Sequence, residues 1–187
     1  MHLAQLLIRS GPEHRKFLRQ IFVSVDITAP LYWWKEFDTY KVGTVANSTS
    51  TMHKLAEYPI TRECFEMDDY VGDLKPYEGN PMCPDTTVDN IWDNLLIDCE
   101  NLRRCYNETK DIRYWKELVR LLPEGWLQTR TVTMNYENLL AICSKGQRRF
   151  HKLTEWRESF INWARTLPYA NQLIFIDEQT SQDFSLN

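Results

Sequence analysis

Apolar and polar residues alternate along IFVSVDI, residues 21–27. This period of two is typical of a half-buried strand, because successive side chains of a strand point to opposite faces. Thr28 follows, and its hydroxyl could cap a helix that carries Pro30 in its first turn and runs to Gly43. We therefore expect a strand followed directly by a short helix.

Further along, apolar residues recur every three or four positions, the spacing of one buried helix face, in several segments. The predicted helices are 88–105, 112–122, 136–144 and 153–167. Residues 126–135 are rich in β-branched side chains and predict a strand or an extended connector. Residues 42–54 are small and polar and indicate a loop, whereas the proline-containing segment 57–85 indicates a long irregular connection.

These elements favour an α+β fold, with a small, mainly antiparallel sheet packed against long helices. No strand–helix–strand alternation is visible, which argues against a doubly wound parallel sheet. A chain of 187 residues is short enough for a single domain spanning 1–187. We expect residues 171–187 to form a flexible tail.

Composition narrows the class of protein. Apolar residues make up 43% of the chain and aromatic residues 13%, which excludes disorder for most of it. The densest apolar run, Leu173 to Ile176, is far too short to cross a membrane. The N-terminus lacks the features of a secretory signal, and the net charge of −4 disfavours a general nucleic-acid binder. We expect a cytoplasmic protein with neither a membrane nor a nucleic-acid partner.

The cysteines and histidines form no recognisable pattern. The five cysteines include no CxxC pair, and the four histidines have no HExxH or similar spacing. We therefore expect neither a disulfide framework nor a protein-bound metal. The GxGxxG and GxxxxGK[ST] motifs of dinucleotide and phosphate-binding loops are also absent from the sequence.

Three segments carry residues suited to anion binding. Lys41–His53 is rich in hydroxyls, Gly146–Lys152 is rich in cations, and Ser10–Phe17 places a histidine between Glu13 and Arg15. Hydroxyls and backbone N–H groups can cradle a phosphate, and arginine can bind it through two hydrogen bonds. Each segment also has a plainer interpretation as solvated surface. No Ser-His-Asp or Cys-His pair can be recognised.

Taken in chain order, these segments resemble motifs of the flavin-dependent thymidylate synthases, the ThyX family. The family's EHxxFxF element has its counterpart in Glu13, His14 and Phe17. In the family's RHRxxSxNExSxRY motif, the place of RHR is taken by Thr39, Tyr40 and Lys41, and that of the first serine by Thr44. After one inserted residue, the N, E, S, R and Y of the motif correspond to Asn47, Ser48, Ser50, Met52 and His53.

The resemblance continues to the end of the chain. Leu122 and Pro123 resemble the family's LP, and Thr133-Met134-Asn135 resembles its TxN. Arg149 lies seven residues before Trp156, as the family's catalytic arginine lies before the tryptophan of AQWEI. The match therefore covers nearly the whole chain, in the right order.

The departures from the family pattern concern mainly charge. The RHR triplet keeps one cation, Lys41, and the arginine that ends the long motif is Met52. Ser48 replaces the motif glutamate, Glu137 replaces the arginine of NxR, and Glu36 replaces a glutamine before RHR. Each lost cation removes charge-assisted hydrogen bonds worth about 1.5–3 kcal/mol.

The resemblance implies a ThyX-like fold in a homotetramer with shared sites. It implies that FAD, reduced by NADPH, serves the transfer of a methylene from methylenetetrahydrofolate to C5 of dUMP, giving dTMP. Arg149 is the implied catalytic residue, stabilising negative charge on the pyrimidine. The implied substrate contacts are Glu36, Ser50, Met52, Arg120 and Arg149. The implied cofactor contacts are His14, Tyr40, Lys41, Thr44, Asn47, Ser48, His53 and Asn135.

Two other interpretations stay open. The missing cations fit a catalytically inactive ThyX-fold protein that binds a nucleotide or acts as a scaffold. Alternatively, the resemblance is accidental and the chain is an aromatic-rich helical interaction domain. Most tryptophans fall at core spacing on the predicted helices, but Trp33 and Trp34 share a helix with Tyr40 and could contact a flavin.

Overall fold

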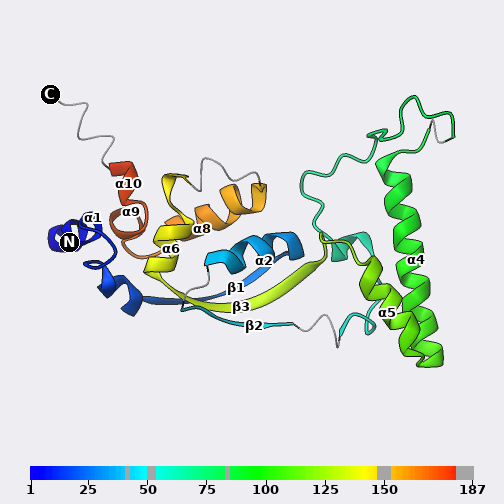
Figure 1. Cartoon of the computed structure of the whole chain (residues 1–187), viewed down its shortest axis with the longest axis horizontal. Helices are drawn as coiled ribbons and strands as arrows, with labels where there is room; N and C mark the ends of the chain where they lie inside the picture. The colour runs from blue at the N-terminus through cyan, green and yellow to red at the C-terminus, as the bar shows by residue number, and fades with distance from the viewer. Residues whose placement is uncertain (41–42, 50–53, 83–84, 147–152, 180–187) are drawn as a thin grey trace. The chain divides into compact units, whose positions relative to one another are not determined.

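The computed structural model describes residues 1–40, 43–49, 54–82, 85–146 and 153–179. Its contacts divide the chain into two compact units (Figure 1). The first joins residues 1–48 to 129–187, and the second is the inserted segment 49–128.

A three-stranded sheet organises the first unit, in the order β1 (Phe22–Pro30), β3 (Leu127–Asn135), β2 (Val45–Ser48). β2 pairs antiparallel with β3, with Ser48 opposite Arg130. β1 also runs antiparallel to β3, because side-chain hydrogen bonds join positions 24, 26 and 28 to 133, 131 and 129 in reverse order. The predicted fold class, a small antiparallel sheet packed with helices, is confirmed.

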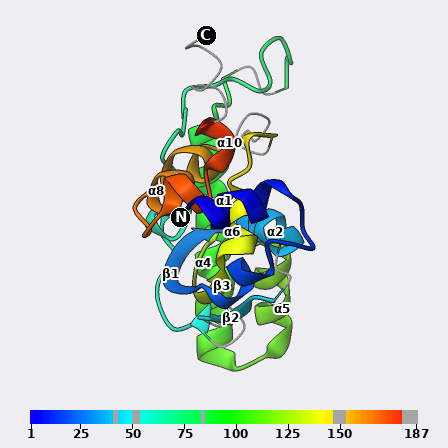
Figure 2. The same ribbon diagram turned by 90° about the vertical axis from the view of Figure 1, so that its left-hand side faces the viewer.

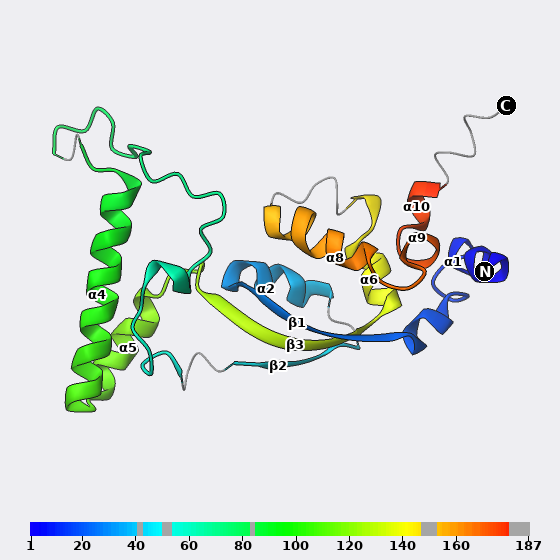
Figure 3. The same cartoon turned by 180° about the vertical axis from the view of Figure 1, so that it is seen from behind.

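The two faces of the sheet differ in polarity. Val132 and Met134 of β3 are buried, and the alternating residues Val23, Val25 and Ile27 of β1 pack against the same core. The helices α2 (Leu31–Phe37), α6 (Tyr136–Ile142) and α8 (Ile161–Arg165) lie over this apolar face (Figures 2 and 3). The predicted alternation in 21–27 is therefore confirmed, because it follows the division between core and exposed face.

Aromatic rings fill the space between the sheet and the helices. Trp33 contacts Trp156 at a centroid distance of 5.2 Å and stacks on Phe37 at 5.2 Å. Trp33, Trp34 and Trp156 are almost fully buried, so the first two are core residues rather than exposed stacking surfaces. Trp156 lies in a π-helical segment, η4 (Glu155–Phe160), that leads into α8. The aromatic-rich composition is thus used largely for packing in this unit.

The chain ends of the first unit are also helical. α1 (His2–Arg9) buries Ile8, and the short helices α9 (Ala170–Leu173) and α10 (Ile176–Gln179) enclose a buried run from Leu173 to Ile176. The predicted flexible tail is therefore wrong for residues 171–179, because their apolar side chains complete the core. Residues 180–187 lie outside the described part of the chain.

The second unit is built on two helices, α4 (Val88–Thr109) and α5 (Ile112–Leu121). A capping box between Thr87 and Asn90 begins α4, because their side chains satisfy backbone N–H groups that the first turn leaves without partners. Cys99 and Leu118 are fully buried in a core of this unit, with Leu55, Ile60 and Phe65. The predicted helices 88–105 and 112–122 are confirmed.

Two further differences from the sequence-based expectations concern local structure. Thr28 does not cap a helix, since its hydroxyl bonds to Thr129 and the strand continues to Pro30. The predicted loop 42–54 contains β2. Of the two alternatives for the segment 126–135, a strand or a connector, the structure has the strand. Short 3₁₀ turns form at η1 (Lys16–Gln20), η2 (Asp38–Tyr40) and η3 (Arg62–Cys64).

Among the described residues, no helix is both long and apolar enough to cross a membrane. No cluster of three or more His, Cys, Asp or Glu side chains in the same part of the chain is placed to hold a metal ion.

Candidate functional site

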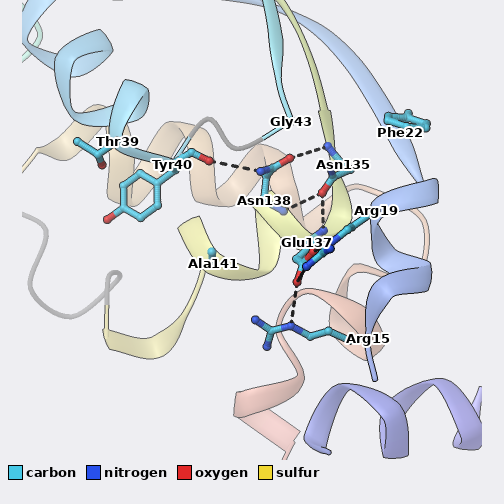
Figure 4. Close-up of a pocket in the computed structure, with 10 residues that line it drawn as sticks. All are labelled: Arg15, Arg19, Phe22, Thr39, Tyr40, Gly43, Asn135, Glu137, Asn138 and Ala141. Atoms are coloured by element: carbon cyan, nitrogen blue, oxygen red, sulfur yellow. Dashed lines mark hydrogen bonds and ion pairs between the residues drawn. The ribbon is translucent and has the colours of Figure 1, made fainter. Parts of the chain in front are cut away.

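One cavity of about 680 Å³ opens in the first unit, where η1, η2 and the start of α6 approach each other (Figure 4). A volume of this size suits an organic ligand. We call it the first pocket. Its lining residues are Arg15, Arg19, Phe22, Thr39, Tyr40, Gly43, Asn135, Glu137, Asn138 and Ala141.

Two asparagines build the floor of the first pocket. Asn135 caps α6 by accepting hydrogen bonds from the backbone N–H groups of Glu137 and Asn138, both at 3.0 Å. Asn138 donates from Nδ2 to the carbonyl oxygen of Tyr40 at 3.3 Å. This bond ties α6 to η2, so that segments almost 100 residues apart in sequence are held together.

Asn135 also offers a donor to the first pocket. The side chain is 6% exposed, its oxygen is used by the cap, and its Nδ2 group has no hydrogen-bond acceptor among the described residues. Gly43 lies beside it with a φ of +78°, and a Cβ there would stand 3.6 Å from Nδ2. Glycine suits this backbone conformation and keeps side-chain atoms away from the amide.

Charge in the first pocket is concentrated at Glu137. Arg15 and Arg19 both donate to its carboxylate, the first at 3.3 Å. The hydrogen bond from Arg19, supported by that from Arg15, lowers the pKa of Glu137 below its ordinary value. The three groups together carry one positive charge, so the pocket can attract an anionic ligand.

Tyr40 contributes to the floor of the pocket mainly through its backbone carbonyl, which accepts the hydrogen bond from Asn138. Its ring lies 5.6 Å from that of Trp156, and its hydroxyl donates to Glu36 at 3.4 Å. Burial, with the nearby Glu36 carboxylate, raises the pKa of Tyr40. In Figure 4 the phenol points away from Asn135 and Glu137, so this hydroxyl is held neutral outside the charged part of the pocket.

A second cavity of about 330 Å³, the second pocket, lies on the helix-covered side of the sheet. Its lining residues are Phe37, Asp38, Thr44, Ala46, Ser48 and Arg130. Arg130 forms an ion pair with Asp38 at 3.4 Å, and its guanidinium carbon lies 4.3 Å from the ring centroid of Trp34. The pocket therefore combines a stacked guanidinium with two hydroxyl side chains.

The structure groups some of the predicted site residues and separates others. Tyr40 and Asn135 line the first pocket, and Thr44 and Ser48 line the second. Glu36 accepts the hydrogen bond from Tyr40. Five other predicted contacts lie outside the described residues, namely Lys41, Ser50, Met52, His53 and Arg149.

Three other predicted contacts do not reach either pocket in this chain. His14 is exposed, and its neighbour Arg15 lines the first pocket instead. Asn47 is exposed and pairs with Thr131 in the sheet register. Because it is adjacent to Ser48 in the strand, its side chain points to the opposite face of the sheet. Arg120 is exposed on α5 and pairs with Glu117 within the second unit.

Sequence reasoning missed Arg15, Arg19 and Arg130 as pocket residues. The partners of Arg15 and Arg19 are over 100 positions away, so local spacing gave no indication of their role. Arg130 could have been noticed, because it shares the strand face of Val132 and Met134, where a charged side chain is unusual.

Comparison with solved structures shows which known fold this architecture resembles. No protein-family model and no curated protein sequence matches the chain significantly. The flavin-dependent thymidylate synthase ThyX of Helicobacter pylori, solved with FAD and dUMP, superposes with a TM-score of 0.56 at 20% identity, covering 93% of this chain and 82% of that one. This chain has a ThyX-like fold.

The ThyX-like fold is also found in PolB, a UMP/dUMP methylase of Streptomyces cacaoi. The complex with 5-Br dUMP superposes with a TM-score of 0.61 at 16% identity, covering 94% of this chain and 80% of PolB. The complex with 5-Br UMP gives a TM-score of 0.58 at 14% identity over 91% and 82% of the two chains. At these identities the likeness establishes the fold, and the residues of the two pockets must carry any argument about ligands.

Proposed function

We propose that this protein binds FAD and a uridine nucleotide and methylates the uracil ring of dUMP to give dTMP. One observation carries the proposal. On a ThyX-like fold, Tyr40 of the segment that resembles RHR and Asn135 of the segment that resembles TxN line one pocket, and a hydrogen bond from Asn138 to the carbonyl of Tyr40 holds α6 beside η2.

The residues of the first pocket fit a flavin cofactor. The Nδ2 group of Asn135 is a donor suited to a ring carbonyl, and the excess positive charge near Arg15 and Arg19 suits an anionic phosphate. Gly43 leaves room above the amide. When bound, the flavin would supply the reducing equivalents, drawn from NADPH, that convert the transferred methylene to a methyl group.

The nucleotide would be held by groups around the second pocket together with motif residues Glu36, Ser50 and Met52. Thr44 and Ser48, which the resemblance implies as cofactor contacts, would then contact the nucleotide instead, because both line the second pocket. Arg149 would act as the catalytic residue by stabilising negative charge on a pyrimidine carbonyl. The methylene would come from methylenetetrahydrofolate. This transfer of the methylene group to the uracil ring needs no nucleophile from the protein. That agrees with the absence of a recognisable catalytic dyad in the sequence.

We further propose a homotetramer in the cytoplasm, with sites completed by neighbouring subunits. Arg120 and His14, which do not reach the pockets of their own chain, would then contact ligands bound by another subunit. Sedimentation equilibrium of the purified protein tests this assembly, which a monomeric mass would contradict.

The reaction is tested by incubating dUMP with the protein, FAD, NADPH and methylenetetrahydrofolate and measuring dTMP. We expect product from the unsubstituted protein. Arg149→Gln should lower the rate by about 100-fold or more, whereas the adjacent Arg148→Gln should change it little. An equal loss in both variants would contradict the role of Arg149.

The charge pattern favours one second candidate, a nucleotide-binding protein without catalysis. Glu137 pairs with both arginines of the first pocket, and the motif cations at 39 and 52 are absent. This candidate predicts that dUMP raises the melting temperature while no dTMP forms. Formation of dTMP would exclude it.

A further inference from the structure

We propose that Arg130 binds the phosphate of the nucleotide in the second pocket. This inference rests on the proposed function for the identity of the nucleotide. It adds a residue that no motif in the sequence indicates. The ligand chemistry is a phosphate monoester carried by a uridine nucleoside.

The position of Arg130 in the sheet is the first argument. Arg130 alternates with Val132 and Met134 toward the helix-covered face of β3, and its side chain is 19% exposed. A partly buried guanidinium requires anionic or hydrogen-bonding partners, and the Asp38 carboxylate is one of them. The strand therefore places a cation at the wall of the second pocket.

The contact with Trp34 is the second argument. The guanidinium carbon lies 4.3 Å from the ring centroid, and Trp34 is itself 1% exposed. A rigid, buried ring therefore restrains the plane of the cation. An arginine stacked on an aromatic face still presents N–H donors along its edge, which suits bidentate binding of a phosphate.

The surrounding hydroxyls are the third argument. Ser48 lies opposite Arg130 in the antiparallel register of β2 and β3, and both side chains line the same cavity, as does Thr44. Hydroxyl donors beside a guanidinium are typical of phosphate sites. The cavity of about 330 Å³ is at the small end for organic ligands, so it suits the phosphate end of a nucleotide.

Asp38 adds a negative charge beside the Arg130 guanidinium in the second pocket. Its carboxylate lies 3.4 Å from Arg130, and it would repel an incoming phosphate while holding the guanidinium in place. Removing this negative charge should therefore strengthen phosphate binding, provided that Arg130 is the phosphate ligand. A purely structural ion pair between Arg130 and Asp38 predicts no such gain.

Isothermal titration tests the inference with three probes: dUMP, deoxyuridine and inorganic phosphate. For the unsubstituted protein we expect dUMP to bind more tightly than deoxyuridine. Arg130→Gln should weaken dUMP binding by about 10-fold or more and change deoxyuridine binding by less than about 2-fold. Arg130→Lys should retain part of the preference, and Asp38→Asn should tighten dUMP binding by roughly 2- to 5-fold.

Arg165→Gln is the matched control, because Arg165 also stacks on an aromatic ring, that of Phe175 at 4.1 Å, and pairs with a carboxylate, Glu178. It should leave dUMP binding unchanged. Circular dichroism and melting curves confirm that each variant is folded. If Arg130→Gln unfolds the protein, the opposite shifts of Arg130→Lys and Asp38→Asn still decide the matter.

Each outcome separates the two proposals. Equal dUMP affinity in the unsubstituted protein and a folded Arg130 variant overturns the role of Arg130 alone. Absence of binding to both dUMP and deoxyuridine overturns the proposed function and, with it, this inference. Binding of inorganic phosphate with no preference for dUMP over deoxyuridine overturns the role of Arg130, because the second pocket would then not bind the phosphate of the nucleotide.

Discussion

Glu137 decides the electrostatics of the first pocket. Its carboxylate, with a side chain only 17% exposed, holds Arg15 and Arg19 from a distant segment of the chain. Where the motif that this segment resembles has an arginine, this chain has a carboxylate that pairs with two arginines. The three groups together carry one positive charge.

Glu137→Gln should make stability less dependent on pH. The folded-state pKa of Glu137 is lowered, so its ionised form stabilises the fold above the ordinary pKa of 4.5, and this contribution is lost as pH falls through the lowered value. We expect the variant to be about 1 kcal/mol less stable at neutral pH and the difference to vanish in acid. Urea unfolding from pH 7 downward measures it.

The control for this experiment is Glu117→Gln, in an exposed pair with Arg120 on α5. It should change stability much less at any pH. A constant difference between Glu137→Gln and the unsubstituted protein across the acid range would show that the carboxylate charge is not what stabilises the fold there.

Asn135→Asp tests the role of the Nδ2 donor in the first pocket separately from the cap of α6. Aspartate keeps the oxygen that caps α6 but replaces the Nδ2 donor by a negative oxygen. We expect FAD affinity to fall by about 10-fold or more, with little change in melting temperature. Asn171→Asp, at an exposed position of α9, should change neither quantity, and unaltered FAD affinity in Asn135→Asp would refute the role of the amide.

At the level of elements, the strongly periodic segments could be predicted and the weakly periodic ones could not. β1, α4 and α5 bury one face each, so their patterns are visible in the sequence. β2 is exposed at all four positions and forms only because β3 offers a partner. The family resemblance implies both Tyr40 and Asn135 as cofactor contacts, and both line the first pocket, whereas Arg130 became visible only once the strands were paired.

The C-terminal helices give the clearest test at this scale. Phe175 is 1% exposed within the core of the first unit, so Phe175→Ala should cost about 3–5 kcal/mol of unfolding free energy. Asn171→Ala, on the exposed side of α9, should cost less than about 0.5 kcal/mol. Chemical denaturation of both variants measures the contrast, and a small loss in Phe175→Ala would restore the flexible-tail interpretation.

On the scale of the whole molecule, the two units have separate cores. Leu118 is fully buried in the second unit, with Cys99 and Phe65 nearby in the same cluster, while both pockets belong to the first unit. Stability of the second unit and formation of the pockets can therefore be separated experimentally.

Leu118→Ala should open the second unit preferentially. The cavity is expected to cost about 2–5 kcal/mol, and hydrogen exchange should accelerate in α4 and α5 while the amides of β1 and β3 stay protected. Val119→Ala, at the neighbouring and 38% exposed position, is the control. Equal acceleration throughout the chain would show that the two units unfold as one.

We propose that a ThyX-like fold with an altered set of cations still forms a flavin site. The flavin absorbance of the purified protein, after incubation with FAD and removal of free cofactor by gel filtration, tests this directly. We expect a flavin band equimolar with the chain and a reduced band for Asn135→Asp. A protein that emerges colourless, while folded by circular dichroism, would contradict it.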